Sequence, residues 1–452
     1  MELIEAVKAA GVVGAGGAGF PTHVKLSAKA ECFIVNGAEC EPLIETDKYF
    51  IRTFPEQIVR AVTAVSAHVG TKRSVFALKK KYKREIEALR QAIAAQGADI
   101  ELFTMPSFYP AGDEQVMVQQ VCGASVPERG IPLDVGAVVD NVGTLLNIYN
   151  ALQGIPVTEK YLSIVGEVAE PVMRKVPLGT SVRECIASAA PTVAEYNVIV
   201  GGPMMGRVVT DPAEIDCLTV TKTTGNLIVL PKGHYLARRA TLKLGRIKAQ
   251  AKSACVQCRM CTSLCPRYLI GHNVQPHLIM RNLYREELVT DLQEYLNTFG
   301  QAANCCDCGV CEMFSCPMGL SPRKVNAYIK GRLREQGIQV PRNTQPTARE
   351  GGIYGKVPTD RLVARLGILP YYQRHAGDEC VELRPETVRV AFQQHIGKPA
   401  VPVVEQGAVV KKGDLLAAAA EGALSANIHA SMDGIVTEIN AAGAVIRRCG
   451  EV

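Results

Sequence analysis

Sixteen cysteines are spread unevenly over the 452-residue sequence, and nine of them fall between Cys255 and Cys316. Two stretches, CVQCRMCTSLCP and CCDCGVCEMFSCP, each carry three cysteines at two-residue gaps, a fourth further on and a proline directly behind it. Three thiolates at this spacing wrap one face of an iron–sulfur cubane. The sequence therefore predicts two [4Fe–4S] clusters, with the ligands Cys255, Cys258, Cys261, Cys265, Cys305, Cys308, Cys311 and Cys316.

In bacterial ferredoxins the fourth cysteine of each run ligates the other cluster. We therefore expect Cys316 to join the first three cysteines of the first run, and Cys265 to join the three of the second run. The second run departs from the pattern in a four-residue last gap and in an extra thiol, Cys306. Zinc is the alternative because it also accepts four thiolates, but zinc sites usually pair two short hooks. The third cysteine at the same gap and the trailing proline favour the clusters.

The composition is that of a globular protein, with 47% hydrophobic and 21% charged residues. The sequence has no run of 18 apolar residues and no leader pattern at its start, so we expect neither a membrane span nor secretion but a cytoplasmic protein. Clustered cysteines fit that reducing compartment. The net charge of +6 is mild and gives no case for nucleic acid. The basic run 72–84 is interpreted as a solvated face, with an acidic partner or a phosphate as the alternative.

Several domains must position the cysteines, because the chain is too long for one hydrophobic core. Expected strands at 32–36, 74–78, 100–104 and 135–140 alternate with helical stretches at 55–69 and 81–95, which is typical of an α/β domain. The fold class is multidomain α/β plus α+β. The expected parts are an α/β domain (1–155), a small α+β unit (156–238), a helical cluster domain (239–337), a long wrapping linker (338–388) and a compact β-sandwich (389–452).

A glycine-rich loop, VVGAGGAG, occupies residues 12–19. Its Gly14, Gly16 and Gly19 match the spacing of the dinucleotide-binding fingerprint. That fingerprint follows a strand and opens a helix, whereas here a helical stretch precedes the loop and Phe20-Pro21 follows it. The glycine spacing alone therefore predicts no more than a turn.

The wider strings are more specific. GVVGAGGAGFPTHVKL, VNGAECEP, YPAGDEQ and DNVGTLLN occur in this order over about 150 residues. They resemble the flavin-binding domain of the NADH-oxidising subunit of respiratory complex I, and more closely the C subunit of the Rnf electron-transport complex. The resemblance implies a noncovalent FMN on the glycine loop, with NADH stacking against the flavin.

The same resemblance implies roles for individual residues. Phe20 matches the aromatic residue beside the adenine of NADH, and Glu114 matches a nucleotide-binding position. Glu39 and Glu41 match acidic positions near the flavin and the nicotinamide, which makes them catalytic candidates; ordinary surface carboxylates are the alternative. Asp113 stands where complex I has Glu, so its role stays open. The implied FMN contacts are Gly14, Gly16, Gly17, Gly19, Lys25, Asn36, Asn141 and Thr144.

Later segments extend the resemblance. VPLGTSVRECIASA with VGGPMMG resembles the β-grasp module of that family, and HIGKPAVPVVEQGAVVKKGDLL with IHASMDGIVTEI resembles its barrel-sandwich hybrid domain. That domain is related to lipoyl carriers, but the tip ASMDGI has no carrier lysine. In the Rnf protein the hybrid domain stands at the N-terminus, whereas here it is C-terminal. This order is similar to the cobalamin reductase family of propanediol-utilisation microcompartments.

The resemblance implies an NADH-dependent reductase that passes electrons through FMN and two [4Fe–4S] clusters to cob(III)alamin or cob(II)alamin, reactivating a B12-dependent diol dehydratase pathway. It also implies packaging in a bacterial microcompartment, with an iron–sulfur shell protein as a further partner. One alternative is the electron-input subunit of an Rnf-type membrane complex. Another is a microcompartment NADH oxidase or electron shuttle with a non-corrin acceptor.

Overall fold

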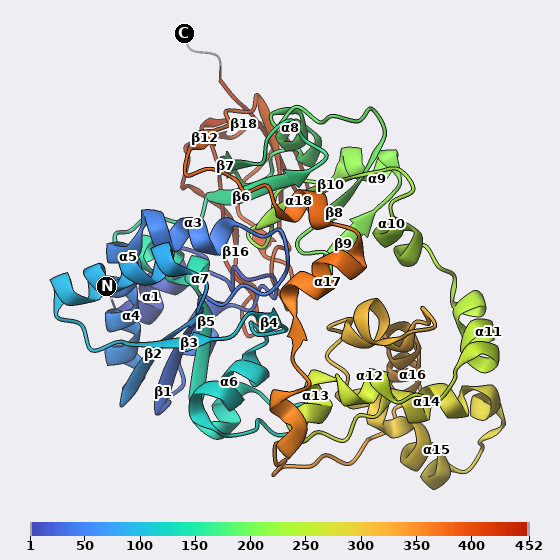
Figure 1. The fold of residues 1–452 in the computed structure, drawn as a ribbon. Helices are drawn as coiled ribbons and strands as arrows, with labels where there is room; N and C mark the ends of the chain where they lie inside the picture. The colour runs from blue at the N-terminus through green and yellow to red at the C-terminus, as the bar shows by residue number, and fades with distance from the viewer. Residues whose placement is uncertain (1, 450–452) are drawn as a thin grey trace.

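The computed structural model describes residues 2–449. Met1 and residues 450–452, at the ends of the first and last predicted domains, lie outside the described residues. The units follow one another along the chain, and a late segment, drawn in orange, runs back between them (Figure 1). Within the described part of the chain, no helix has both the length and the apolar composition that crossing a membrane requires.

The N-terminal unit is built on a parallel sheet in the order β3-β2-β1-β5. The strands β1, β2 and β5 contain buried apolar runs because both faces of the sheet are covered there, whereas most of the edge strand β3 is partly or fully exposed. Phe33 and Val35 pack among α4, α5 and α7, whereas Ile34 points to the opposite face, against α6. The elements are β1 (Cys32–Asn36), β2 (Arg73–Lys79), β3 (Glu101–Met105), β4 (Phe108–Tyr109), β5 (Ala137–Asn141), α1 (Leu3–Ala9), α2 (Thr22–Leu26), α3 (Thr46–Thr53), α4 (Pro55–Val69), α5 (Lys83–Gln96), α6 (Glu114–Cys122) and α7 (Val142–Leu152).

The second unit is a mixed sheet in the order β12-β7-β6-β10-β8-β9, in which the edge strand β12 (Cys380–Glu382) comes from later in the chain. The hairpin β6–β7 is antiparallel, and the returning strand β10 pairs in parallel with β6 at the centre. A hairpin, a helix and returning strands in this order are the arrangement expected of a β-grasp module. Its elements are β6 (Glu159–Gly166), β7 (Val172–Pro177), α8 (Val182–Ala187), β8 (Tyr196–Val200), β9 (Arg207–Val209), α9 (Pro212–Cys217) and β10 (Asn226–Pro231).

A helical unit carries the cysteine runs and forms its own apolar core around Phe299, Val325 and Ile329. The stretch Cys311–Ser315 is a π-helical turn inside the second run. The helices are α10 (Tyr235–Ala240), α11 (Leu244–Ala254), α12 (Met260–Ser263), α13 (Pro266–Leu269), α14 (Pro276–Asn282), α15 (Leu292–Phe299) and α16 (Pro322–Glu335).

Residues 338–388, expected as a linker, contain regular elements that join the other units. β11 (Val357–Pro358) pairs with β4 of the first unit, and β12 (Cys380–Glu382) extends the second sheet beside β7. The apolar side of α17 (Thr359–Leu366) packs in one core with residues of the first and helical units, and α18 (Leu369–Tyr372) follows it. The segment therefore fastens three units together.

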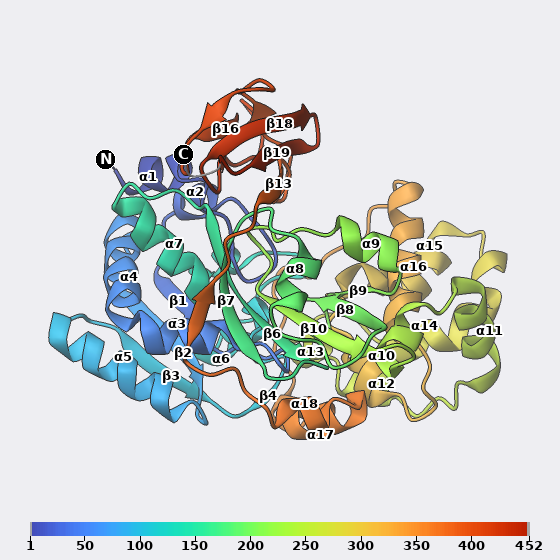
Figure 2. The ribbon, with the colours of Figure 1, turned by 90° about the horizontal axis from the view of Figure 1, so that it is seen from above.

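The C-terminal unit is a sandwich of two small sheets around a shared apolar core. It lies beside α1 and α2 (Figure 2). Lys222 joins the two regions, because its Nζ donates to the carbonyls of both Gly11 and Asn427 at 2.6 Å. The strands are β13 (Thr387–Ala391), β14 (Val401–Pro402), β15 (Val409–Val410), β16 (Leu415–Ala418), β17 (Ile428–His429), β18 (Gly434–Asn440) and β19 (Gly443–Arg447).

Candidate flavin and iron–sulfur sites

The carboxyl ends of β1 and β5 form the centre of the candidate flavin site. Asn36 and Asn141 are the last residues of these parallel strands and stand opposite each other in register. The Asn36 amide donates to the carbonyl of Gly112 at 2.9 Å, and the Asn141 amide donates to Asp47 at 2.7 Å. Ligands of open parallel sheets bind outside the carboxyl ends of the strands, so the fold brings these two predicted residues to such an edge.

Lys25 lies on α2 and points to the same edge. Its Nζ is 2.7 Å from the carbonyl of Val139, 3.2 Å from Asp140 Oδ1 and 3.5 Å from Glu114 Oε1. Burial alone would lower the pKa of Lys25, but the two carboxylates outweigh it and the pKa is raised. Lys25 is therefore a fixed cation, and it brings the predicted residue Glu114, at the start of α6, into the site.

The glycine loop closes over this edge. The backbone N–H of Ala15 donates to Thr144 Oγ1 at 2.9 Å, which ties the loop to α7. Gly17 has a φ of +110° and open space where a Cβ would stand. Gly19 behaves differently: its carbonyl accepts from Ile396, and an added Cβ would meet Thr223 at 3.1 Å. The loop thus exposes Gly16 and Gly17, whereas Gly19 lies in a contact with the β-grasp and C-terminal units.

These residues fit FMN on two observations. Asp140 Oδ2 is buried and has no hydrogen-bond partner among the described residues, so an acceptor is available for a hydroxyl or N–H of a ligand. The exposed backbone at Gly16 and Gly17 allows close approach of a phosphate or a ring. Gly14 and Phe20 bracket the loop, with the Gly14 N–H donating to the Phe20 carbonyl at 2.9 Å.

Glu39 and Glu41 follow β1 and lie beside this edge, lining a cavity discussed below. Glu39 Oε1 accepts the N–H of Glu41 at 2.8 Å. Glu41 Oε2 accepts the N–H of Met204 in the β-grasp unit at 2.9 Å, and its Oε1 is 3.4 Å from the hydroxyl of Tyr109. Burial raises the pKa of Glu41 to about 8. Both residues are partly buried and hydrogen-bonded, unlike ordinary surface carboxylates.

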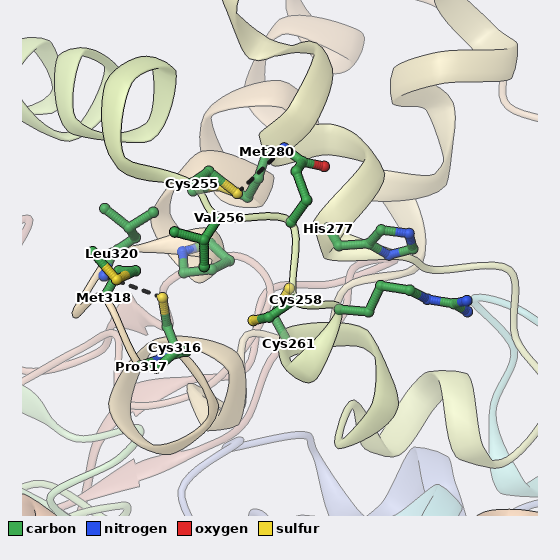
Figure 3. Close-up of a pocket in the computed structure, with 13 residues that line it drawn as sticks. Cys255, Val256, Cys258, Cys261, His277, Met280, Cys316, Pro317, Met318 and Leu320 are labelled. Atoms are coloured by element: carbon green, nitrogen blue, oxygen red, sulfur yellow. Dashed lines mark hydrogen bonds between the residues drawn. The ribbon is translucent and has the colours of Figure 1, made fainter.

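Four thiols of the helical unit surround one pocket, and they are the four that the crossed ferredoxin pattern groups together. Cys255, Cys258 and Cys261 come from the first run, and Cys316 closes the pocket from the second (Figure 3). Cys258 is exposed, whereas Cys316 is buried and accepts the N–H of Leu320 at 3.4 Å. We call these four residues the outer thiol set.

The backbone repeats its conformation in the two runs. Gln257 and Arg259 have positive φ, at +58° and +64°, and Asp307 and Gly309 have it at the same places relative to Cys305. Alternating right- and left-handed residues turn successive N–H groups inward and form anion-binding nests of the kind found at iron–sulfur sites. This repeat aligns Cys305 with Cys255 and leaves Cys306 as the extra thiol.

The remaining predicted ligands, Cys265, Cys305, Cys308 and Cys311, form the inner thiol set. Burial raises the pKa of the Cys311 thiol well above its ordinary value, and the neighbouring Cys305 and Cys265 raise it further. Cys306 is a close neighbour of Cys308. Two thiol sets, each with cysteines from both runs and with left-handed backbone positions between its cysteines, fit two cubane clusters.

Two contacts join the flavin unit to the inner thiol set. The hydroxyl of Tyr109 donates to the carbonyl of Cys308 at 2.8 Å. Arg267, two residues after Cys265, forms a two-pronged ion pair with Asp113 at the start of α6. Neither Tyr109 nor Arg267 was predicted from the sequence, although Tyr109 opens the motif YPAGDEQ and Arg267 directly follows the first cysteine run.

Two buried carboxylates of the flavin edge were also missed from the sequence. Asp47 accepts from the Asn141 amide, and Asp140 pairs with Lys25. Asp140 directly precedes Asn141, so the motif DNVGTLLN contained its signal. Asp47 lies outside the four quoted motifs, and its place in the site follows from the packing of α3.

Three family models match the chain: the Nuo51 FMN-binding domain over residues 7–150, a 4Fe–4S dicluster domain over 254–321 and the RnfC barrel sandwich hybrid domain over 365–447. The third match begins inside α17, before the predicted start of the hybrid domain. Together with the fold, these matches define the protein as an oxidoreductase that carries FMN and iron–sulfur clusters.

The chain belongs to the family of the cobalamin reductase PduS. It is 43% identical to "Cobalamin reductase PduS" of Salmonella typhimurium over 97% of this chain and 95% of that protein. It is 41% identical to the protein of the same name from Citrobacter freundii, over 96% and 94%. The C subunit of the proton-translocating ferredoxin:NAD(+) oxidoreductase complex of Clostridium ljungdahlii is 30% identical over 63% of this chain and 60% of its own length.

Proposed function

We propose that this protein is an NADH-dependent reductase of cobalamin. FMN, when bound, supplies the conversion between the two electrons of a hydride and the single electrons that iron–sulfur clusters accept. Gly16, Gly17 and Lys25 would hold it, with Asn36, Asn141 and Thr144 ordering the backbone around it. Near-full-length identity to two proteins named cobalamin reductase supports the corrin acceptor.

The observation that carries this proposal is the position of the two thiol sets, one against the flavin unit and the other at the surface. The inner set contacts the flavin unit through Tyr109 and Asp113, whereas the outer set reaches the surface at Cys258. Around Cys258 the apolar side chains of Val256 and Met318 are 58% and 48% exposed. The inner set therefore suits entry of electrons from the flavin, and the outer set suits their exit to an acceptor that docks on this apolar surface.

The test is an anaerobic NADH titration of the reconstituted protein, followed by visible absorbance, with hydroxocobalamin added at the end. We expect the flavin and cluster bands to bleach and the cob(II)alamin spectrum then to form. Bleaching by dithionite but not by NADH would show that the nucleotide site does not function and would overturn the proposal.

A pair of variants tests the exit surface. Met318→Glu places a charge beside the outer set, so cob(II)alamin formation should slow while bleaching by NADH is unchanged. Leu288→Glu is the control, because Leu288 is 77% exposed in the same unit and does not line the outer pocket. Equal rates in both variants would place the exit elsewhere.

The match to a component of a ferredoxin:NAD(+) oxidoreductase complex supports a second candidate, electron input to such a complex. That match spans 63% of this chain, which favours the first candidate. Adding reduced ferredoxin and NAD(+) in place of hydroxocobalamin separates the two.

We further propose, from the family resemblance, that the protein is packaged in a bacterial microcompartment and meets an iron–sulfur shell protein there; co-purification with shells tests this.

A further inference from the structure

A cavity of about 370 Å³ opens on the flavin unit where the returning segment crosses it. Its walls come from the loop after β1, from the end of β2 and from residues 372–378. Part of the basic run 72–84 lines it, so that run is more than a solvated face. Cavities of this size hold a small ligand or a nucleotide fragment.

Lys79, the last residue of β2, is only 2% exposed and lines this cavity. Among the described residues, its Nζ forms no ion pair or hydrogen bond, and it lies 5.9 Å from the ring centroid of Tyr82. Burial lowers the pKa of Lys79 to about 8. Without direct contact, Glu39 raises this pKa, and Lys81 and Lys48 lower it. A buried ammonium group that forms no ion pair is costly, and Glu39 acts on Lys79 only from beyond ion-pair distance. An anion bound directly to Lys79 would stabilise it.

A second cation faces the cavity without a carboxylate partner among the described residues. Lys81 Nζ is 2.7 Å from the hydroxyl of Tyr372 and lies over that ring. The hydroxyl belongs to the returning segment, so Lys81 is held at the place where the segment closes the cavity. Lys81 is exposed, whereas Lys79 is buried. The charge of Lys81 lowers the pKa of Lys79, so the two cations are near each other.

The carboxylates of the cavity wall are already engaged elsewhere. Glu45 pairs with Lys48 at 2.6 Å and with His375 at 3.0 Å. Glu85 pairs with Arg52, and Asp378 pairs with both Arg52 and Arg84. Glu39 and Glu41 accept the backbone N–H groups described above, and Glu39 also interacts electrostatically with Lys79 and Lys48. Among the described residues, Lys79 and Lys81 are therefore the cavity lysines that form no ion pair.

We propose that this cavity binds a phosphate group, held by Lys79 and Lys81, at a site separate from the loop that faces the flavin. Lysine binds phosphate as a compact point charge, and two lysines that line one cavity suit a phosphate or a diphosphate. Two sources share this chemistry. One is the diphosphate of NADH, which rests on the proposed function, and the other is a free phosphorylated ligand.

Calorimetric titration of the oxidised holoprotein with pyrophosphate and with ADP tests the proposal without any turnover. We expect both probes to bind the native protein and Lys80→Met, and to bind Lys79→Met at least about tenfold more weakly. Lys80 is the matched control because it is adjacent, exposed and of equal charge. Lys79→Arg keeps the cation and should keep binding, and its FMN content shows that the unit is folded.

Steady-state kinetics then show whether the bound phosphate group belongs to NADH or to a separate ligand. If ADP competes with NADH and Lys79→Met raises KM without changing kcat, the phosphate belongs to NADH. If ADP binds without affecting KM, the ligand is a separate phosphorylated molecule. Failure of pyrophosphate and ADP to bind the native protein, or equal binding by Lys79→Met, would overturn the proposal. Binding is measured on the oxidised protein. The calorimetric result can therefore be interpreted even if the protein fails to oxidise NADH.

Discussion

The guanidinium of Arg267 donates two hydrogen bonds to the carboxylate of Asp113, at 2.6 and 2.9 Å. Asp113 also caps α6, since its Oδ1 accepts the N–H groups of Gln115 and Val116. One side chain thus orders the start of a flavin-unit helix and fastens it beside Cys265. The carboxylate of Asp113 contacts its own helix and the arginine together.

Arg267→Lys tests this link. Lysine keeps the charge but loses the planar fork, so the inner thiol set should sit less firmly against the flavin unit. We expect NADH to reduce the flavin normally while the clusters are reduced more slowly, with a melting temperature a few degrees lower. Anaerobic stopped-flow absorbance resolves the two phases. Arg281→Lys, at an exposed position of α14, is the control, and equal cluster rates in both variants would contradict the assignment.

The extra thiol gives a second prediction. Because the left-handed backbone positions align Cys305 with Cys255, Cys305→Ala should lose one cluster and about half of the iron. Cys306→Ala should keep both. Iron analysis and electron paramagnetic resonance of the reduced variants measure this. The reverse result would mean that Cys306, which lies beside Cys308, is the ligand.

Lys25 supplies a third prediction. It is the cation held between Asp140 and Glu114 at the flavin edge, so Lys25→Met removes a charge-assisted donor and leaves a buried carboxylate unpaired. The Kd for FMN should rise about tenfold to a hundredfold. Fluorescence of free FMN during dialysis measures it. Lys29→Met is the control, because Lys29 is exposed and, among residues 2–449, donates a hydrogen bond to the carbonyl of His68 alone. Unchanged FMN affinity in Lys25→Met would remove this residue from the site.

The fourth prediction is that the stability of the protein depends on pH through Glu41. Burial raises its pKa from 4.5 to about 8, so the folded protein keeps a proton that the unfolded chain has already released between these values. Unfolding then releases this proton, and stability falls as the pH rises through that window, by at most about 1.4 kcal/mol per pH unit.

Glu41→Gln cannot titrate but can still accept the N–H of Met204. Its melting temperature should therefore fall less than that of the native protein between pH 5.5 and 8. Glu170→Gln, at an exposed carboxylate, should follow the native curve. If both variants follow the native curve, Glu41 does not carry the raised pKa.

Features that depend on neighbours in the chain could be read from the sequence. The apolar run CFIVN predicted a strand at 32–36 and the structure has β1 there, because a strand buried on both faces needs an unbroken apolar run. The helix expected at 55–69 is α4, which begins at Pro55 and ends before Gly70, two strong local signals. The two cysteine runs are equally local, since the two-residue gaps alone set which three thiols of each run can share a cluster.

Only the tertiary structure decided which distant groups meet. Arg267 and Asp113 are 154 residues apart, and Tyr109 reaches Cys308 across 199. No periodicity or spacing encodes such pairs, because they follow from how separately folded units dock. For the same reason the basic run 72–84 could not reveal that Lys79 is buried: that burial depends on Tyr82 and on a segment almost 300 residues later that closes the cavity.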